Sequence, residues 1–252
     1  MKVDVIILAG AQNCGPLKDV ATTEHEALIK IADAPMVEYV IKAVNRAKNT
    51  GQVIVVGPIR ELKQSVKEKI DIFIEAGASM KENIFKGVNA LNNAEYVLLM
   101  TSDIPLITDV VIDEYIAACL DDSEADLYYP IIPKESNMAK FPAVKRTYFH
   151  LEEGVFTGGN MVIVKPEILK EITEILDKAI AWRKKPWKLS KMLGMKFIFK
   201  FAIGHLSLDE IESKVAKITG CQGHFMITRH PEIGFDVDKP SDLKIMRDEF
   251  IS

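Results

Sequence analysis

Short apolar runs alternate with amphipathic segments along most of the chain. The runs of strand length are VDVIILA from residue 3, QVIVVG from 52, IDIFIEA from 70, AEYVLLM from 94, DLYYPII from 126, NMVIVK from 160 and KFIFKFAI from 196. Nearly continuous Val, Ile and Leu are typical of strands that are buried on both faces. We therefore expect each run to form a strand of one sheet.

Segments with helical periodicity separate most of these runs. In residues 35–48, the apolar side chains that share one stripe are Met36, Val37, Val40, Ile41 and Val44. In residues 79–91, the same arrangement places Met80, Ile84, Val88 and Leu91 together. Ser207 and Glu210 have capping-box spacing, which predicts a further helix over residues 207–218. Buried strands that alternate with such helices predict an α/β protein with a mainly parallel, mixed sheet and helices on both faces.

The alternation breaks after about residue 133. The next 26 residues have no clean period and predict a long excursion or hairpin over one edge of the sheet. Residues 182–194 read as helical but lack a strand partner. We expect one domain over residues 1–252, of which about 133–165 and 180–195 are elaborations.

Composition limits the kind of partner. A net charge of −4 disfavours general binding to nucleic acid. The three cysteines have neither disulfide-framework nor zinc-site spacing. Asp4 interrupts the first apolar run, which is too short for a signal peptide, and no run approaches the ~20 residues of a membrane span. We expect a cytoplasmic protein with no nucleic-acid or membrane partner.

The first predicted strand leads into a loop that contains Gly10 and Gly15. A P-loop would require Lys and then Ser or Thr after the second glycine, where Pro16 and Leu17 stand. A dinucleotide fingerprint would require glycine at Gln12, and Pro16 removes a backbone donor. The loop therefore matches neither of these phosphate-binding motifs.

In open parallel sheets, ligands bind beyond the carboxyl ends of the strands. Asp103 follows a fully apolar strand, and a carboxylate there suits Mg²⁺, which takes one or two carboxylates plus substrate phosphates. Asp103 could instead cap the next helix, although Thr108 or Asp109 is better placed to do so. Asp103 is therefore a candidate metal ligand.

A second acidic segment lies near the C-terminus of the sequence. Asp236 and Asp238 would share one face of an extended segment, since side chains alternate with a period of two. Asp238 or Ser241 could equally cap the helix that begins near Pro240. Taken together with Asp103, these residues predict a metal site built from two distant segments.

Two further segments carry candidate binding residues. Gly77 and Ser79 stand between a strand and a helix, where free backbone N–H groups can accept an anion or a base edge, although Ser79 may be an ordinary N-cap. Gly158 and Gly159 let the backbone approach a ligand, and Asn160 offers a donor and an acceptor. A β-bulge or turn explains the two glycines equally well.

A basic cluster with two aromatic residues lies in the second elaboration. Its members are Trp182, Arg183, Lys184, Lys185, Trp187, Lys188 and Lys191. The cluster could meet phosphates, or it could be a solvated helix face with the two aromatic side chains packed inward.

The segments that carry a family resemblance are, in chain order, LAGAQNCG, EALIKIADAPMVEYVIKAV, GASMKENIFKGVNAL, LLMTSDIPLIT, TGGNM and FDVDKPSDL. Through them the chain resembles the nucleotidyltransferases of the glycosyltransferase-A-like superfamily. The resemblance spans nearly the whole chain and is strongest to the molybdopterin-guanylyltransferase-like branch. It implies a Rossmann-like nucleotide-diphospho-sugar transferase fold. It also implies transfer of a nucleoside monophosphate from a nucleoside triphosphate to a small phosphorylated acceptor, with Mg²⁺ as cofactor and release of pyrophosphate.

The resemblance also implies roles for particular residues. The catalytic residues would be Asp103, Asp238, Lys30 and Lys18, and the metal ligands Asp103, Asp238 and Asp236. The nucleotide would contact Leu8, Ala9, Gly10, Ala11, Gly77, Ser79, Asn83 and Ser102, with Asn83 at the position that reads the base. The acceptor would contact Gly158, Gly159 and Asn160.

Three positions depart from the family pattern. Ala11 replaces a second glycine, Lys18 is the one cation in a loop that usually carries Arg, and Glu26 stands at the usual lysine position. Lys30 could substitute if the loop is repositioned. The alternative is a catalytically degenerate nucleotide-binding protein of the same fold. A nucleotide-sugar glycosyltransferase ranks last, because the D-x-D pair at Asp236 lies in the DVDKP context of nucleotidyltransferases.

Overall fold

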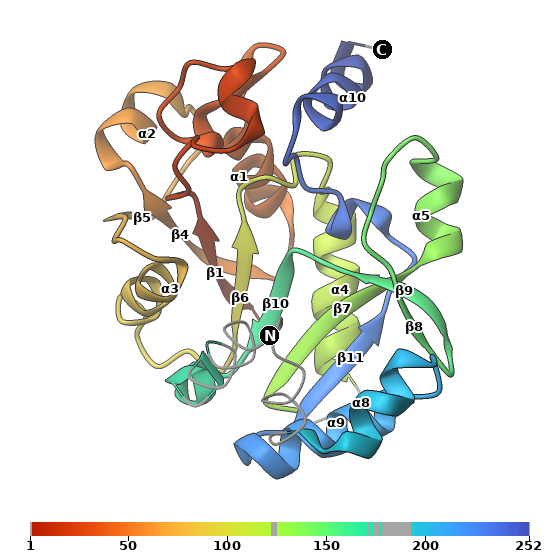
Figure 1. The fold of residues 1–252 in the computed structure, drawn as a ribbon. Helices are drawn as coiled ribbons and strands as arrows, with labels where there is room; N and C mark the ends of the chain where they lie inside the picture. The colour runs from red at the N-terminus through yellow and green to blue at the C-terminus, as the bar shows by residue number, and fades with distance from the viewer. Residues whose placement is uncertain (1, 122–124, 171, 174–176, 178–192, 252) are drawn as a thin grey trace.

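The structure is a computed structural model that describes residues 2–121, 125–170, 172, 173, 177 and 193–251. In these residues the main sheet has nine strands (Figure 1). Its strands are β1 (Val3–Leu8), β4 (Thr50–Gly57), β5 (Ile72–Glu75), β6 (Val97–Thr101), β7 (Leu127–Pro133), β8 (Phe149–Leu151), β9 (Gly154–Gly158), β10 (Met161–Val164) and β11 (Gly223–Ile227). The short strands β2 (Lys30–Ile31) and β3 (Ala34–Pro35) form a separate pair.

The strand order is β5-β4-β1-β6-β10-β7-β9-β8, and β11 pairs with β7. β5, β4, β1 and β6 are parallel to one another, whereas β10 runs antiparallel to both β6 and β7. The sheet is therefore mixed, and its N-terminal half is wholly parallel. This confirms the predicted α/β class.

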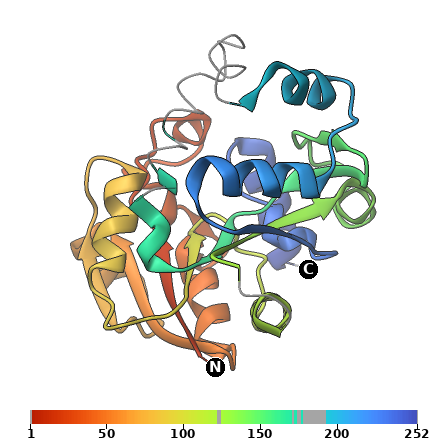
Figure 2. The ribbon, with the colours of Figure 1, turned by 90° about the horizontal axis from the view of Figure 1, so that it is seen from below.

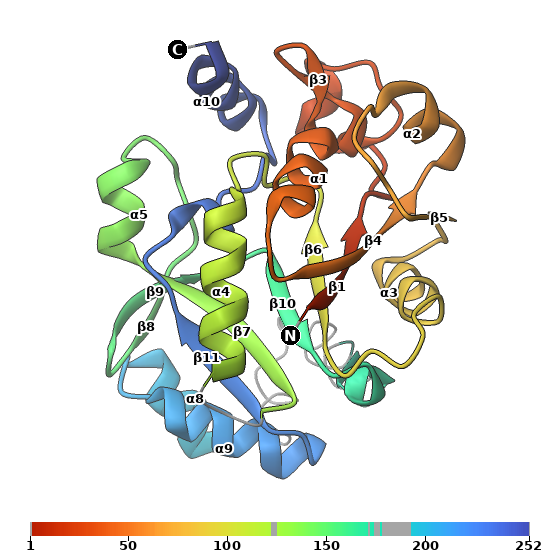
Figure 3. The ribbon, with the colours of Figure 1, turned by 180° about the vertical axis from the view of Figure 1, so that it is seen from behind.

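The helices are α1 (Met36–Arg46), α2 (Ile59–Ser65), α3 (Met80–Val88), α4 (Asp109–Asp121), α5 (Lys134–Lys140), α8 (Met195–Ala202), α9 (Leu208–Thr219) and α10 (Pro240–Ile251). Figure 2 shows α3 and α9 on one side of the sheet and α1 and α4 on the other. From behind, α1 and α4 lie in front of the strands (Figure 3). Helices therefore cover both faces, as predicted.

Side chains of β1 alternate between the two faces, as the period of a strand requires. Val5 and Ile7 join the core that α1 and α4 cover, whereas Ile6 and Leu8 join the core under α3. The predicted stripe of α1 is buried along its whole length. In α3, Ile84 and Val88 pack on the sheet, but Met80 is 64% exposed, so the stripe predicted from Met80 to Leu91 fails at its first residue.

The irregular segment after β7 forms α5 and then the hairpin β8–β9 at one edge of the sheet, which confirms the predicted excursion. β11, which pairs in parallel with β7, is a strand that the sequence pattern does not predict. Its segment, GHFMI, contains a glycine and a histidine and so lacks a continuous apolar run.

The predicted strand over residues 196–203 is wrong, because Met195–Ala202 forms the helix α8. Lys196 and Lys200 lie four residues apart and therefore share one face of a helix. Phe197 packs against a small core, whereas Phe199 is 63% exposed. Most of the predicted helix over residues 182–194, with its basic and tryptophan cluster, lies outside the described residues.

A second core fixes the loop after β1. Leu17, Ile29 and Met36 pack with residues of α10 and with Phe235 and Val237, all of them buried. This core holds the loop against the segment that carries Asp236 and Asp238. Across the described ranges, no helix combines the length and apolar character needed to cross a bilayer.

Candidate nucleotide and metal site

The carboxyl ends of β1, β5 and β6 open onto a cavity of about 720 Å³. The predicted site residues that line it are Leu8, Gly10, Ala11, Gly77, Ser79, Asn83, Ser102 and Asp103. Glu26 and His25 line it as well. The structure thus brings most of the predicted nucleotide residues to one cavity.

Gly10 is required by close packing. A Cβ atom at Gly10 would lie 2.7 Å from the Cβ of Ala76 and 2.8 Å from Nδ2 of Asn83. Asn83 is buried, and its Oδ1 accepts a hydrogen bond of 2.6 Å from the backbone N–H of Gly77. The loops after β1 and β5 therefore meet at Asn83 and form the floor of the cavity.

The N-terminus of α3 is already satisfied by the protein itself. The Ser79 hydroxyl accepts a hydrogen bond from the Glu82 N–H, and the Glu82 carboxylate accepts one of 2.8 Å from the Ala78 N–H. The N-cap alternative for Ser79 is thus what the structure shows. Gly77 and Ser79 still line the cavity, but their helix end offers an incoming anion fewer free donors than the sequence predicted.

Residues 11–13 pair with residues 24–26, and this pair of segments forms another part of the cavity wall. The Asn13 N–H donates to the Glu24 carbonyl at 2.8 Å, and the Glu26 N–H donates to the Ala11 carbonyl at 3.1 Å. This pairing places the side chains of His25 and Glu26 in the cavity, where burial raises the pKa of Glu26. Nδ1 of His25 is buried and has no hydrogen-bond partner in the part of the chain that is described.

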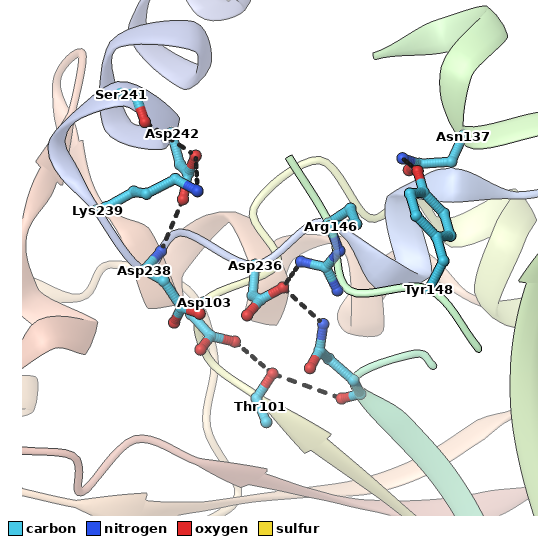
Figure 4. A network of polar contacts seen from close by, with 11 residues as sticks. Thr101, Asp103, Asn137, Arg146, Tyr148, Asp236, Asp238, Lys239, Ser241 and Asp242 are labelled. Carbon is cyan, nitrogen blue, oxygen red and sulfur yellow. Dashed lines mark hydrogen bonds and ion pairs between the residues drawn. The ribbon is translucent and has the colours of Figure 1, made fainter. Parts of the chain in front are cut away.

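The three predicted acidic residues come together at the mouth of the sheet. Carboxylate oxygens of Asp103, Asp236 and Asp238 lie within 4.8 Å of one another. Backbone bonds hold the two segments side by side, since the Val237 N–H donates to the Asp103 carbonyl at 3.0 Å. Figure 4 shows Asp103 and Asp238 adjacent, with Asp236 turned toward Arg146.

Each carboxylate of this cluster has a different set of partners. Thr101 donates its hydroxyl proton to Asp103, while Arg146 and the Asn160 amide donate to Asp236. The Asp238 N–H donates to the Asp242 carboxylate on α10, so the contact of Asp238 with this helix runs through its backbone. The Asp238 side chain thus remains the exposed member of the cluster.

Two of the three carboxylates of the cluster have raised pKa values. Burial raises the pKa of Asp103 to about 6, and the charges of Asp236 and Glu26 add to the rise. Burial and the neighbouring Asp236 carboxylate raise the pKa of Asp238 as well. Burial acts in the same direction on Asp236, but the Arg146 guanidinium outweighs it and the pKa of Asp236 is lowered. The cluster therefore lacks cationic charge on the side of Asp103 and Asp238.

Arg146 and His25 are site residues that the sequence analysis missed. Arg146 lies in the irregular segment between α5 and β8, where no periodicity placed it near the strand ends. His25 precedes Glu26, and the one unusual feature of that segment in the sequence was Glu26 at the family's usual lysine position. The ion pair of Arg146 with Asp236 is largely buried, with both side chains 15% exposed.

Other predicted residues lie elsewhere. Ala9 is fully buried under the loop, and its N–H donates to the Val56 carbonyl at 2.8 Å. Lys18 and Lys30 are exposed and do not line the cavity. Gly158 is needed for packing, because a Cβ there would lie 2.3 Å from the Tyr129 hydroxyl. Asn160 contacts the acidic cluster through Asp236.

A family comparison agrees with this geometry. Residues 5–186 match the model of the MobA-like NTP transferase domain. The chain belongs to that family. No curated protein is similar enough in sequence to be matched. The family confirms the predicted enzyme class, a nucleotidyltransferase with an NTP transferase domain.

Solved structures resemble this NTP transferase over nearly its whole length. A hypothetical transferase from Thermus thermophilus is 32% identical with a TM-score of 0.81, over 96% of this chain and 100% of that one. CMP:2-keto-3-deoxy-manno-octonic acid synthetase, complexed with CTP, is 12% identical with a TM-score of 0.65, over 100% and 99%. The 2-C-methyl-D-erythritol 4-phosphate cytidylyltransferase of Thermus thermophilus is 14% identical with a TM-score of 0.57, over 100% of both chains. The last two establish a shared fold.

Proposed function

We propose that this NTP transferase moves a nucleoside monophosphate from a nucleoside triphosphate to a small phosphorylated acceptor in a Mg²⁺-dependent reaction. An oxygen of the acceptor phosphate forms a bond to the α-phosphorus, the bond from that phosphorus to the bridging oxygen breaks, and pyrophosphate leaves with the electron pair. The observation that supports this most strongly is the convergence of Asp103, Asp236 and Asp238 at the cavity mouth.

The acidic cluster fits Mg²⁺ by its donor set. Hard divalent cations prefer carboxylate oxygens and keep several waters. Asp103 and Asp238 would hold the ion, because Asp236 already accepts hydrogen bonds from Arg146 and Asn160. Bound there, Mg²⁺ supplies charge neutralisation and orientation of phosphate oxygens. Arg146 holds Asp236 in place and sets the position of the cluster.

The cavity wall supports binding of the nucleotide. Gly10 packs directly against Ala76 and Asn83, so the loops after β1 and β5 form one wall of the cavity. His25 lines the cavity as well, so its ring can contact a bound nucleotide. Asn83 already accepts a bond from Gly77, so its NH₂ group is what remains to contact a base.

The test is pyrophosphate release from each nucleoside triphosphate with Mg²⁺ and a panel of phosphorylated acceptors. Asp103→Asn keeps an acceptor for the Thr101 hydroxyl but removes the charge, so we expect release to fall at least about 100-fold. Asp121→Asn is the matched control, since Asp121 is exposed at the end of α4 and lies outside both the cavity and the cluster. An unchanged rate in Asp103→Asn would overturn the assignment.

Glu26 supports a second candidate, a nucleotide-binding protein without turnover. Its carboxylate lines the cavity at the position of the family's lysine and would repel a triphosphate. Calorimetry separates the two candidates, since tight nucleotide binding without pyrophosphate release across all acceptors favours the second. Glu26→Lys would then restore release, and Glu24→Lys, two residues away and exposed, is its control.

A further inference from the structure

A second cavity of about 670 Å³ lies beside the nucleotide cavity, on the face of the sheet between α3 and α9. The two cavities share Leu8, Met80 and Thr101. The second cavity therefore adjoins the first at the carboxyl ends of β1 and β6. We call it the trough.

The floor of the trough is apolar because alternate residues of the middle strands face it. Leu99, Val162 and Leu127 line it from β6, β10 and β7, and Phe225 lines it from β11. Val215 and Ile218 form its wall on α9. Leu127, Val162, Phe225, Val215 and Ile218 are only partly buried by the described residues, so apolar surface remains for a ligand.

Two polar side chains at one end of the trough donate hydrogen bonds to the acidic cluster. Thr101 donates its hydroxyl proton to Asp103, and the Asn160 amide donates to Asp236. Both residues line the trough where it meets the nucleotide cavity. A ligand with a polar group at the end beside the acidic cluster and an apolar remainder therefore fits this lining.

We infer that the trough holds the acceptor, and that the acceptor is a phosphate monoester of an apolar alcohol rather than a sugar phosphate. The phosphate lies at the Thr101 end, next to the acidic cluster and its cation, and the hydrocarbon part lies on the sheet. Burial of a hydrocarbon part on this lining is favourable, whereas a sugar would lose hydrogen bonds to water there. The role of this ligand as acceptor rests on the proposed function, whereas its binding rests on the trough alone.

The experiment compares n-decyl phosphate with glucose 1-phosphate as acceptor, in direct binding by calorimetry and in pyrophosphate release. Val215→Asp places a charge in the trough. We expect it to weaken decyl phosphate binding by roughly tenfold or more and to leave the affinity for nucleotide within about twofold. Val110→Asp is the matched control, because Val110 is 57% exposed on α4 and lies outside both cavities. Ile218→Ser tests the same wall if Val215→Asp does not fold.

Binding of decyl phosphate that weakens in Val215→Asp but not in Val110→Asp supports the inference. No binding of decyl phosphate, or faster pyrophosphate release with glucose 1-phosphate, would overturn it. No binding, together with a melting temperature that falls far more in Val215→Asp than in Val110→Asp, would mean that the trough is packed by the chain itself. If decyl phosphate binds as expected and no nucleotide releases pyrophosphate, the proposed function fails and the assignment of the trough stands.

Discussion

Replacing Asp103 by Asn should change how the stability of the metal-free protein depends on pH. The folded protein holds Asp103 with a pKa of about 6, against 3.8 for an ordinary aspartate. Between these two values the folded protein binds more protons than the unfolded chain. The contribution of Asp103 to the free energy of unfolding is therefore full below about pH 4 and is lost as the pH rises through 6.

The size of the effect follows from the shift. A rise in pKa from 3.8 to about 6 corresponds to about 3 kcal/mol in the free energy of unfolding. Water around the exposed Asp238 screens the cluster, so we expect about 1–2 kcal/mol. For a chain of 252 residues this amounts to roughly 2–8 °C in melting temperature. Mg²⁺ should return this stability at pH 7.5 and do much less at pH 5.

The assay is thermal or urea unfolding between pH 4.5 and 7.5, with EDTA and with Mg²⁺, for the wild type and Asp103→Asn. Carboxyls whose pKa is lowered, such as Asp71 beside Lys69, change stability in the opposite direction. The difference between the two proteins cancels their contribution. A difference that stays constant with pH, or equal stabilisation of both proteins by Mg²⁺, would refute the reasoning.

Three further substitutions test other parts of the site. Gly10→Ala should lower stability by about 1–3 kcal/mol and weaken nucleotide binding, because its Cβ would meet Ala76 and Asn83, whereas Gly15→Ala has room and should do neither. His25→Ala should weaken nucleotide affinity about fivefold in calorimetry, through loss of the contact that its ring makes at the cavity wall, with stability little changed. Arg146→Ala should cost about 2–4 kcal/mol in urea unfolding by leaving Asp236 unpaired, and adding Asp236→Asn should recover most of it. Equal effects of Gly10→Ala and Gly15→Ala, unchanged affinity in His25→Ala, or no recovery in the Arg146 double mutant would contradict these expectations.

Periodicity predicted the elements that carry the sheet and its cover. The strand before Asp103 is a continuous apolar run, and the apolar residues of α1 have regular helical spacing. Both patterns arise because these elements pack into one large core. The two-residue period also predicted that Asp236 and Asp238 would share a face, and their oxygens do meet Asp103. The strands and the helix stripe were predicted because burial leaves a strong periodic signal in the sequence.

Each failure has its own physical cause. α8 exposes large apolar side chains, among them Met195 and Phe199, so its sequence reads as a buried strand. β11 is only partly buried and therefore carries a weak pattern. Arg146 lies in a segment whose position depends on tertiary contacts, and no spacing along the chain could place its guanidinium against Asp236.

The charges of the nucleotide cavity indicate how the parts of the site depend on one another. No lysine or arginine lines the cavity in the described residues, while Asp103, Glu26 and Glu75 do. Arg146, which contacts the acidic cluster, is already paired with Asp236. The negatively charged cavity lining would therefore repel the negatively charged triphosphate. The ion proposed at Asp103 and Asp238 would have to offset this repulsion as well as assist the reaction, so we expect nucleotide binding itself to require the metal.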